Sequence, residues 1–162
     1  MLHRRLPRLD LPDASYYLTC CLEGRRPLLQ IHSLAQCLLD LFVSYRDRGD
    51  ILLHAYVLMP DHYHVGLTVQ AEPSISNLLR KIHSLSAQHC HRSLGIGGRI
   101  WQRRFYDHVI RDERDWDAQF SYMHANPVLA KMVGNEVDYP WSSARFWWTG
   151  EGPVICDALL FH

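Results

Sequence analysis

The chain has 162 residues, of which 48% are hydrophobic, with 17 basic and 17 acidic residues and a formal net charge of zero. This length and apolar content predict a single domain over residues 1–162 with a full core and exclude a small scaffold held by disulfides. The neutral charge does not indicate nucleic acid. However, 15 of the 17 basic residues are arginine, whose planar guanidinium suits phosphate and stacks on bases. Codon bias in a GC-rich genome explains the arginines equally well.

The five cysteines are odd in number and include no C-x-x-C pair, which is typical of reduced thiols without a structural zinc site. No apolar run approaches the roughly 20 residues that span a bilayer, and the arginine-containing N-terminus lacks the apolar stretch of a secretory signal. We therefore expect a soluble, cytoplasmic protein without a membrane partner. Residues 1–13 and 150–162 are the expected flexible or docking tails.

Hydrophobic periodicity and turn signals predict a strand, helix, strand, strand, helix, strand, helix order. In chain order, the elements are expected at residues 15–22, 31–48, 51–59, 62–69, 74–93, 104–110 and 112–126. Pro127 is expected to end the last helix, because proline disfavours helical geometry in the residue before it. The order resembles a split βαβ, ferredoxin-like α+β fold. Its antiparallel sheet would carry the helices mainly on one face and leave the other open to a ligand.

The core faces of the helices follow from helical spacing. In the first helix the expected core residues are Ile31, Leu34, Leu38, Leu41, Phe42 and Tyr45. In the second helix they are Ile75, Leu78, Leu79, Ile82 and Leu85.

Side chains alternate along the strand at 62–69. The apolar face, expected under the helices, carries Tyr63, Val65, Leu67 and Val69. The opposite face carries His62, His64, Gly66 and Thr68. The two histidines should therefore project together from the open face, beside a glycine that leaves room, and they can bind one metal ion. Two half-exposed histidines without a metal are the competing interpretation, which an isolated His-x-His favours.

The last helix has a core stripe and a polar stripe side by side. Trp116, Phe120 and Met123 form the core stripe. Asp115, Gln119, Tyr122 and Asn126 form the polar stripe, at spacings i, i+4, i+7 and i+11. Tyr122 taken alone is equally an amphipathic tyrosine at a surface.

Residues 101–108 (WQRRFYDH) interleave arginines with aromatic side chains. This pattern suits phosphate contact combined with base stacking. An edge strand with solvated arginines is an equally good interpretation.

Together these features suggest phosphoryl chemistry. A phenol has a pKa near ~10 and is a poor nucleophile at neutral pH, so it needs activation. A divalent metal that polarises a phosphate would lower the barrier. His62 and His64 leave most of an octahedral shell open, and Asn126 could add an amide oxygen. Mg²⁺ or Mn²⁺ fits this chemistry, and imidazole ligands favour Mn²⁺.

Four segments, in order, resemble the single-tyrosine HUH transposases, specifically the subgroup associated with repetitive extragenic palindromes (REP). They are 56–67 (YVLMPDHYHVGL), 101–111 (WQRRFYDHVIR), 122–128 (YMHANPV) and 140–143 (PWSS). The resemblance runs from about residue 12 to 148. It favours the functional interpretation of each motif above over its competitor.

The resemblance implies a ferredoxin-like HUH endonuclease fold acting on single-stranded DNA with a foldback hairpin. It implies that Tyr122 attacks a phosphodiester to form a 5′-phosphotyrosine, with His62, His64 and Asn126 as ligands of Mg²⁺ or Mn²⁺. It also implies a bacterial, nucleoid-associated protein that is monomeric, in contrast to dimeric insertion-sequence relatives. A hairpin-DNA-binding protein without cleavage activity and an autonomous insertion-sequence transposase are the alternatives. A metalloprotein unrelated to DNA, with His62, His64 and a cluster such as His89 and His91 as ligands, is a weaker alternative, because positions i and i+2 of a helix do not share a face.

Two positions depart from the family pattern. Tyr63 stands where an aliphatic residue is usual between the histidines; it should face the core, away from the metal, and its hydroxyl would need a partner if buried. Asp61 stands where asparagine is frequent, and either tunes metal affinity or caps the turn. The residues favoured for DNA contact, each of which is equally a solvated charge, are Arg4, Arg5, Arg8, Arg80, Lys81, Arg103, Arg104 and Arg111.

Overall fold

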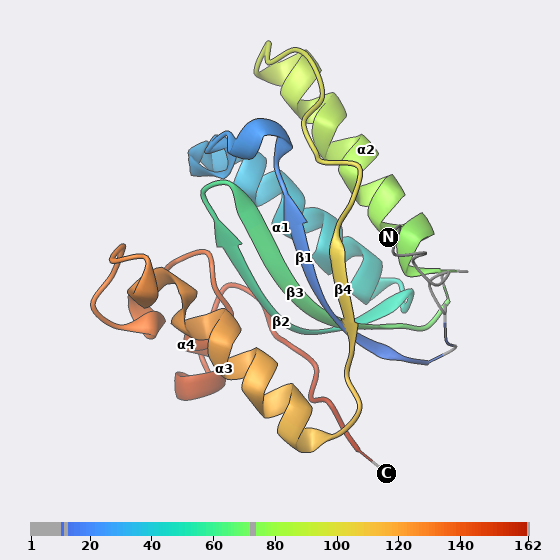
Figure 1. Ribbon diagram of the computed structural model, residues 1–162, viewed down its shortest axis with the longest axis vertical. Helices are drawn as coiled ribbons and strands as arrows, with labels where there is room; N and C mark the ends of the chain where they lie inside the picture. The colour runs from blue at the N-terminus through green and yellow to red at the C-terminus, as the bar shows by residue number, and fades with distance from the viewer. Residues whose placement is uncertain (1–10, 12, 72–73, 162) are drawn as a thin grey trace, which may run out of the picture.

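The computed structural model describes residues 11, 13–71 and 74–161 (Figure 1). The strands are β1 (Ser15–Cys21), β2 (Ile51–Met59), β3 (His62–Val69) and β4 (Tyr106–Val109). The α-helices are α1 (His32–Asp47), α2 (Ile75–Ser93), α3 (Glu113–Leu129) and α4 (Ala144–Thr149). Short 3₁₀ turns lie at Glu23–Arg25, Leu28–Gln30 and Glu136–Asp138.

The four strands form one antiparallel sheet in the order β2-β3-β1-β4. β2 and β3 are a hairpin that turns at Pro60-Asp61, and β1 inserts between β3 and the edge strand β4. The two βαβ crossovers and this strand order confirm the expected ferredoxin-like α+β fold. The register sets Thr19 of β1 opposite His64 of β3, so both side chains share a face.

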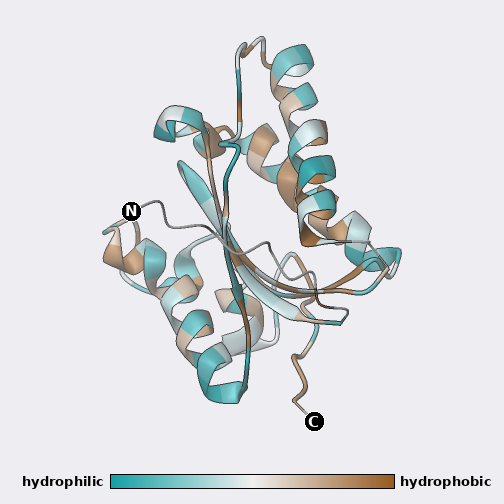
Figure 2. Cartoon of the chain, turned by 45° about the vertical axis from the view of Figure 1, so that its right-hand side comes forward, coloured by the Kyte–Doolittle hydropathy of each residue, from teal (hydrophilic) through white to brown (hydrophobic). Residues whose placement is uncertain are grey.

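Helices α1 and α2 cover one face of the sheet, and they bury the apolar side of β3 as its alternation predicts (Figure 1). Tyr63, Val65 and Leu67 belong to this core, and each side chain is fully buried. Hydrophobic and hydrophilic residues alternate around α2, as expected for a helix with one face on a core (Figure 2).

The opposite face of the sheet is not as open as expected, because α3 lies on it (Figure 1). A second core joins Trp116 and Met123 of α3 to Tyr17 of β1 and to Ala55 and Val57 of β2. The site must therefore lie where α3 meets the sheet, and not on a bare surface.

Three predicted details are wrong. Helix α3 does not stop at Asn126 but continues to Leu129, with Pro127 inside its last turn. The Pro127 ring is buried, and this packing offsets the preference of the preceding residue for extended geometry. In α2, Leu85 is 44% exposed, and the core stripe passes through Ser86 and Cys90. The last strand begins at Tyr106, two residues later than expected.

The chain after α4 docks along β2. Val154 and Cys156 are buried, and the Asp157 backbone N–H donates to the carbonyl of Leu53 at 2.8 Å. The Asp157 carboxylate accepts from the Leu53 N–H at 2.9 Å and from both Nε and Nη2 of Arg46. These contacts bind residues 154–157 to the sheet. None of the helices in the described ranges has the length and apolar character needed to cross a membrane.

Candidate active site

His62 and His64 project together from β3, as the alternation predicts. Their ring centroids are 4.9 Å apart at an interplanar angle of 81°. His64 is 4% exposed, whereas the ring of His62 at the start of the strand is partly accessible. Both imidazoles therefore lie close to one point between the sheet and α3.

The ring of His64 is held from one side. Its Nδ1 lies 2.8 Å from the hydroxyl oxygens of both Tyr17 and Thr19 on β1. The Tyr17 ring is also stacked on the imidazole, with centroids 5.3 Å apart. With the ring proton on Nδ1, these oxygens accept it and Nε2 keeps its lone pair. The buried Nε2 has no hydrogen-bond partner among the described residues.

Burial lowers the pKa of His64 to about 3, and the charges of His62 and Arg25 add to this. The Asn126 side chain acts in the opposite direction without reversing the shift. At neutral pH the imidazole is therefore uncharged, which is the form that ligates a metal.

His62 is oriented by its neighbour Asp61. The Nδ1–H of His62 donates to Oδ1 of Asp61 at 2.6 Å, and Nε of Arg25 lies 2.8 Å from Oδ2 of the same carboxylate. Burial raises the pKa of Asp61, but the hydrogen bond from His62 and the charge of Arg25 outweigh it and hold the pKa below its ordinary value. An ionised Asp61 fixes the proton on Nδ1 and leaves Nε2 of His62 free.

Helix α3 brings Tyr122 and Asn126 to the histidines. The Tyr122 ring lies edge-on to His64, with centroids 6.0 Å apart, and Tyr122 is 53% exposed. Asn126 donates from Nδ2 to the Tyr122 carbonyl at 2.8 Å, a bond that leaves its Oδ1 available to a ligand. The structure thus joins the polar stripe of the helix to the histidine face of the strand, as the resemblance implies.

Two contacts set the distance between α3 and the sheet. Gly66 lies on the histidine face of β3, and an added Cβ would come 2.5 Å from Cη2 of Trp116. The space beside the histidines is therefore filled by an α3 side chain, which corrects the expectation that Gly66 leaves room there. Deeper in α3, the Nε2 of buried His124 lies 2.8 Å from Oγ of Ser143. Ser143 precedes α4 and connects to the sheet, because its Oγ accepts from the backbone N–H of Tyr56 on β2 at 2.9 Å.

These residues fit a divalent cation. A buried imidazole nitrogen without a partner costs about 1–3 kcal/mol, which a ligand at that nitrogen would offset. In the described ranges, no group of three or more His, Cys, Asp or Glu side chains is arranged to hold a metal. An amide oxygen is a group of another type that ligates cations, and Asn126 supplies one beside His64.

The predicted DNA-contact residues are distributed over different parts of the molecule. Arg80 and Lys81 lie on α2, on the other side of the sheet from Tyr122, and Arg103 shares a cavity with Arg80. Arg104 is exposed, and Arg111 lies 3.6 Å from Asp115 at the start of α3. The remaining three predictions, Arg4, Arg5 and Arg8, lie outside the described residues.

Sequence reasoning missed the residues that support the site. Tyr17 and Thr19 alternate with core residues on β1, which places them on the histidine face and was a usable signal. Arg25 has no such signal, because its position depends on a turn in which its own φ is 55°. His108 connects β4 to the first turn of α3, because its Nε2 lies 2.8 Å from Oδ1 of Asp115.

Comparison with known proteins connects this geometry to a family. The sequence model described as "Transposase IS200 like" matches residues 11–126, from just before β1 to Asn126. The chain is 26% identical over 137 residues to the REP-associated tyrosine transposase of Escherichia coli (strain K12), covering 84% of this chain and 79% of that protein. It is 33% identical over 101 residues to a putative REP-associated tyrosine transposase of Haemophilus influenzae (strain ATCC 51907 / DSM 11121 / KW20 / Rd), covering 55% and 56% of the two chains.

Solved structures agree with the sequence comparison. The chain is similar to a REP-associated tyrosine transposase bound to a REP hairpin, with a TM-score of 0.73 and 27% identity. That match covers 97% of this chain and 94% of the other. A putative transposase from Deinococcus radiodurans R1 has a TM-score of 0.50 at 20% identity, covering 75% and 95%, and supports the fold alone.

Proposed function

The chain belongs to the IS200-like transposase family and is related to the REP-associated tyrosine transposases, and on this premise we propose that it cleaves and rejoins single-stranded DNA beside a hairpin. The observation that carries the proposal is the position of Tyr122, whose ring is 6.0 Å from that of His64. The exposed tyrosine is open to a DNA strand, and the buried Nε2 of His64 beside it has no partner.

In the proposed reaction the Tyr122 hydroxyl oxygen attacks the phosphorus of a phosphodiester. A bond forms between the tyrosine oxygen and phosphorus, the bond from phosphorus to the 3′ oxygen breaks, and the phenol proton is lost as the 3′ oxygen gains one. The products are a 5′-phosphotyrosine and a 3′-hydroxyl. Because one phosphoester replaces another, the reverse step rejoins the strand without a nucleotide cofactor.

A divalent cation, Mg²⁺ or Mn²⁺, held by His62, His64 and Asn126 would polarise the scissile phosphate and so offset the weak nucleophilicity of the phenol. The other residues act on these ligands. Asp61 orients the imidazole of His62 and the Tyr17 hydroxyl orients that of His64, so the Nε2 lone pair of each ring is free to bind the cation. Orienting ligands and nucleophile in advance lowers the entropic cost of the reaction.

Tyr63, although adjacent to both histidines, is not the proposed nucleophile. Its side chain is fully buried under the helices, and its hydroxyl lies 2.8 Å from Nε2 of His83 on α2. Burial raises the pKa of Tyr63 well above its ordinary value.

We further propose that the protein acts as a monomer on hairpin DNA. The α3 helix that carries Tyr122 and Asn126 packs on the sheet of its own chain through Trp116 against Gly66, and its His124 contacts Ser143, which is bonded to the backbone of Tyr56 on β2. One chain therefore assembles all four proposed active-site residues, and no exchange of helices between subunits is needed.

The test is adduct formation with a hairpin oligonucleotide that carries single-stranded flanks, in Mn²⁺ or Mg²⁺, followed on a denaturing gel. Tyr122→Phe should abolish the protein–DNA adduct and keep hairpin binding. Tyr106→Phe is the matched control, because Tyr106 is also exposed, at 59%, and pairs with Thr19 beside the site. An adduct that persists in Tyr122→Phe would show that another group is the nucleophile.

A further inference from the structure

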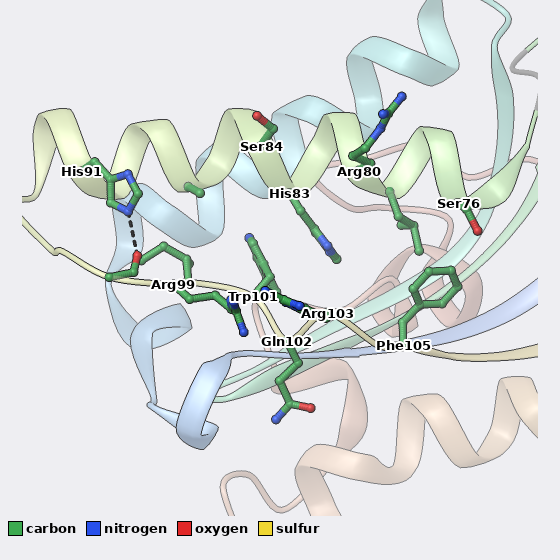
Figure 3. A pocket seen from close by; sticks show the side chains of 14 residues that line it. Ser76, Arg80, His83, Ser84, His91, Arg99, Trp101, Gln102, Arg103 and Phe105 are labelled. Atoms are coloured by element: carbon green, nitrogen blue, oxygen red, sulfur yellow. Dashed lines mark hydrogen bonds between the residues drawn. The ribbon is translucent and has the colours of Figure 1, made fainter.

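A cavity of about 500 Å³ lies away from the tyrosine, between α2 and residues 98–105, the segment that leads into β4 (Figure 3). It is on the side of the sheet that α1 and α2 cover, because Trp101, which lines it, packs against Tyr63 and His83. The proposed cleavage reaction makes no use of it.

The floor of the cavity is aromatic and rigid. The Trp101 ring stacks on His83 with centroids 4.4 Å apart and an interplanar angle of 10°, and its Nε1 donates to Oγ of Ser86 at 2.9 Å. Phe105 forms a wall, where it is only partly buried (Figure 3). The far end is closed by His91, whose Nε2 lies 2.9 Å from the carbonyl of Gly98. Trp101 itself is buried, at 6% exposure, so the partly exposed ring of Phe105 is the aromatic face suited to stacking on a planar ligand.

The charge of the cavity has one sign. Arg80, Arg99 and Arg103 line it, and no aspartate or glutamate does so among the described lining residues. Arg80 donates to the neutral amide of Asn77, and Arg103 has no ion pair within the described ranges. Arg99 lies 3.9 Å from the carboxylate of Glu23, which does not line the cavity. Arg80 and Arg103 are therefore the two lining guanidiniums without an ion pair in the described part of the chain, and in a protein with zero net charge they form a local site for an anion. The fork of arginine matches a phosphate in particular.

We infer that this cavity binds one unpaired nucleotide of the DNA strand, with its base against Phe105 and its phosphate between Arg80 and Arg103. The inference rests on the proposed function for the identity of the ligand as DNA. The volume is in the range that holds one small ligand, and it is too small for a duplex. β4 is the edge strand, so a single strand can pass around it from the tyrosine face to the cavity.

Binding should be measured without metal in a Tyr122→Phe background, so that it is independent of cleavage. Hairpins with a 5′ or a 3′ single-stranded extension are compared with a blunt hairpin by fluorescence anisotropy. The combined change Arg80→Gln and Arg103→Gln should weaken binding of one extended hairpin about 10-fold or more and lower its salt slope by about 1–2, because each phosphate contact releases about one counterion. The blunt hairpin should be bound as before.

The matched control is Arg92→Gln, an exposed arginine on the same helix that does not line the cavity. It should leave both affinities unchanged. An equal loss for blunt and extended hairpins, or no loss for either extension, would overturn the inference. Displacement of the extended hairpin by micromolar deoxynucleoside monophosphate would also overturn it, because the cavity would then be a site for free nucleotides.

Photo-crosslinking gives a second, independent readout. A 5-iododeoxyuridine placed at successive positions of the extension should crosslink to Phe105 at one position. Phe105→Leu should remove this crosslink. Tyr106→Leu should keep it, since Tyr106 is the register partner of Thr19 and so lies on the histidine face of the sheet, away from the cavity. A crosslink that is lost only in Tyr106→Leu contradicts the inference. The anisotropy and crosslinking experiments measure binding and do not require cleavage. A negative cleavage assay would therefore count against the proposed reaction alone, and negative binding results would count against the cavity alone.

Discussion

The contact between Gly66 and Trp116 predicts that the smallest possible enlargement at Gly66 will displace the tyrosine helix. In Gly66→Ala the new Cβ would lie 2.5 and 2.6 Å from two atoms of the Trp116 ring. The ring has little freedom to move away, because it is buried and has His54 and Phe120 at centroid distances of 5.9 and 5.5 Å. Relief therefore requires α3 to move by about 1 Å from the sheet, since carbon atoms pack at roughly 3.5–4.0 Å.

The expected cost in the free energy of unfolding is about 1–3 kcal/mol, which is typical of overpacking in a core. Adduct formation should fall up to ~100-fold, because about 1 Å of misplacement of a nucleophile has that effect. Urea unfolding followed by circular dichroism gives the first quantity, and a denaturing-gel time course gives the second. Gly134→Ala is the control, because an added Cβ there meets nothing within 4 Å.

Trp116→Phe should compensate for Gly66→Ala, because it removes the ring atoms that would clash with the new Cβ. The double variant with Gly66→Ala should be more stable and more active than Gly66→Ala alone, with a coupling energy of about 0.5–3 kcal/mol. The reasoning is refuted if Gly66→Ala unfolds at the same urea concentration as the unaltered protein, or if Trp116→Phe brings no recovery.

Three further outcomes are expected. Asp61→Asn should weaken Mn²⁺ binding about 10–100-fold in calorimetry, because His62 loses the carboxylate that orients it, and an unchanged affinity contradicts that role. Tyr63→Phe should lower the free energy of unfolding by about 1–3 kcal/mol by leaving the buried nitrogen of His83 unpaired. Tyr63→Phe should not alter adduct formation. Loss of the adduct in this variant would make Tyr63 a candidate nucleophile. Burial lowers the pKa of His83 to about 3 and that of His124 to about 4, so the unfolded chain takes up protons first on acidification. Stability should therefore be fully present above pH ~6.5 and decline between about pH 6.5 and pH 4, and urea midpoints that stay constant over this range would contradict the assignment.

Local pattern was sufficient for the hairpin of β2 and β3 and for the two histidines. The ends of β2 and β3 agree with the predicted bounds, because a period of two and a Pro-Asp turn depend only on neighbouring residues. The same alternation placed His62 and His64 on one face and Tyr63 on the other.

The arrangement around the histidines depends on contacts between distant segments, which a local pattern does not encode. In the sequence Gly66 predicts room beside the histidines, but that space is filled by the ring of Trp116, 50 residues later. His124 reads as one more polar residue of α3, yet it is fully buried against Ser143. The position of Tyr122 beside His64 was predicted through family resemblance, and the packing of α3 supplies its physical cause.

The most direct test of the proposed chemistry is to locate the covalent bond. The adduct is digested with nuclease and trypsin, and the peptide that carries the residual nucleotide is identified by mass spectrometry. Residues 115–131 (DWDAQFSYMHANPVLAK) form one tryptic peptide whose single tyrosine is Tyr122. We predict that the nucleotide mass is on this peptide, on the Tyr122 oxygen. A nucleotide on residues 105–111, which contain Tyr106, or on the peptide that contains Tyr63, would contradict the account.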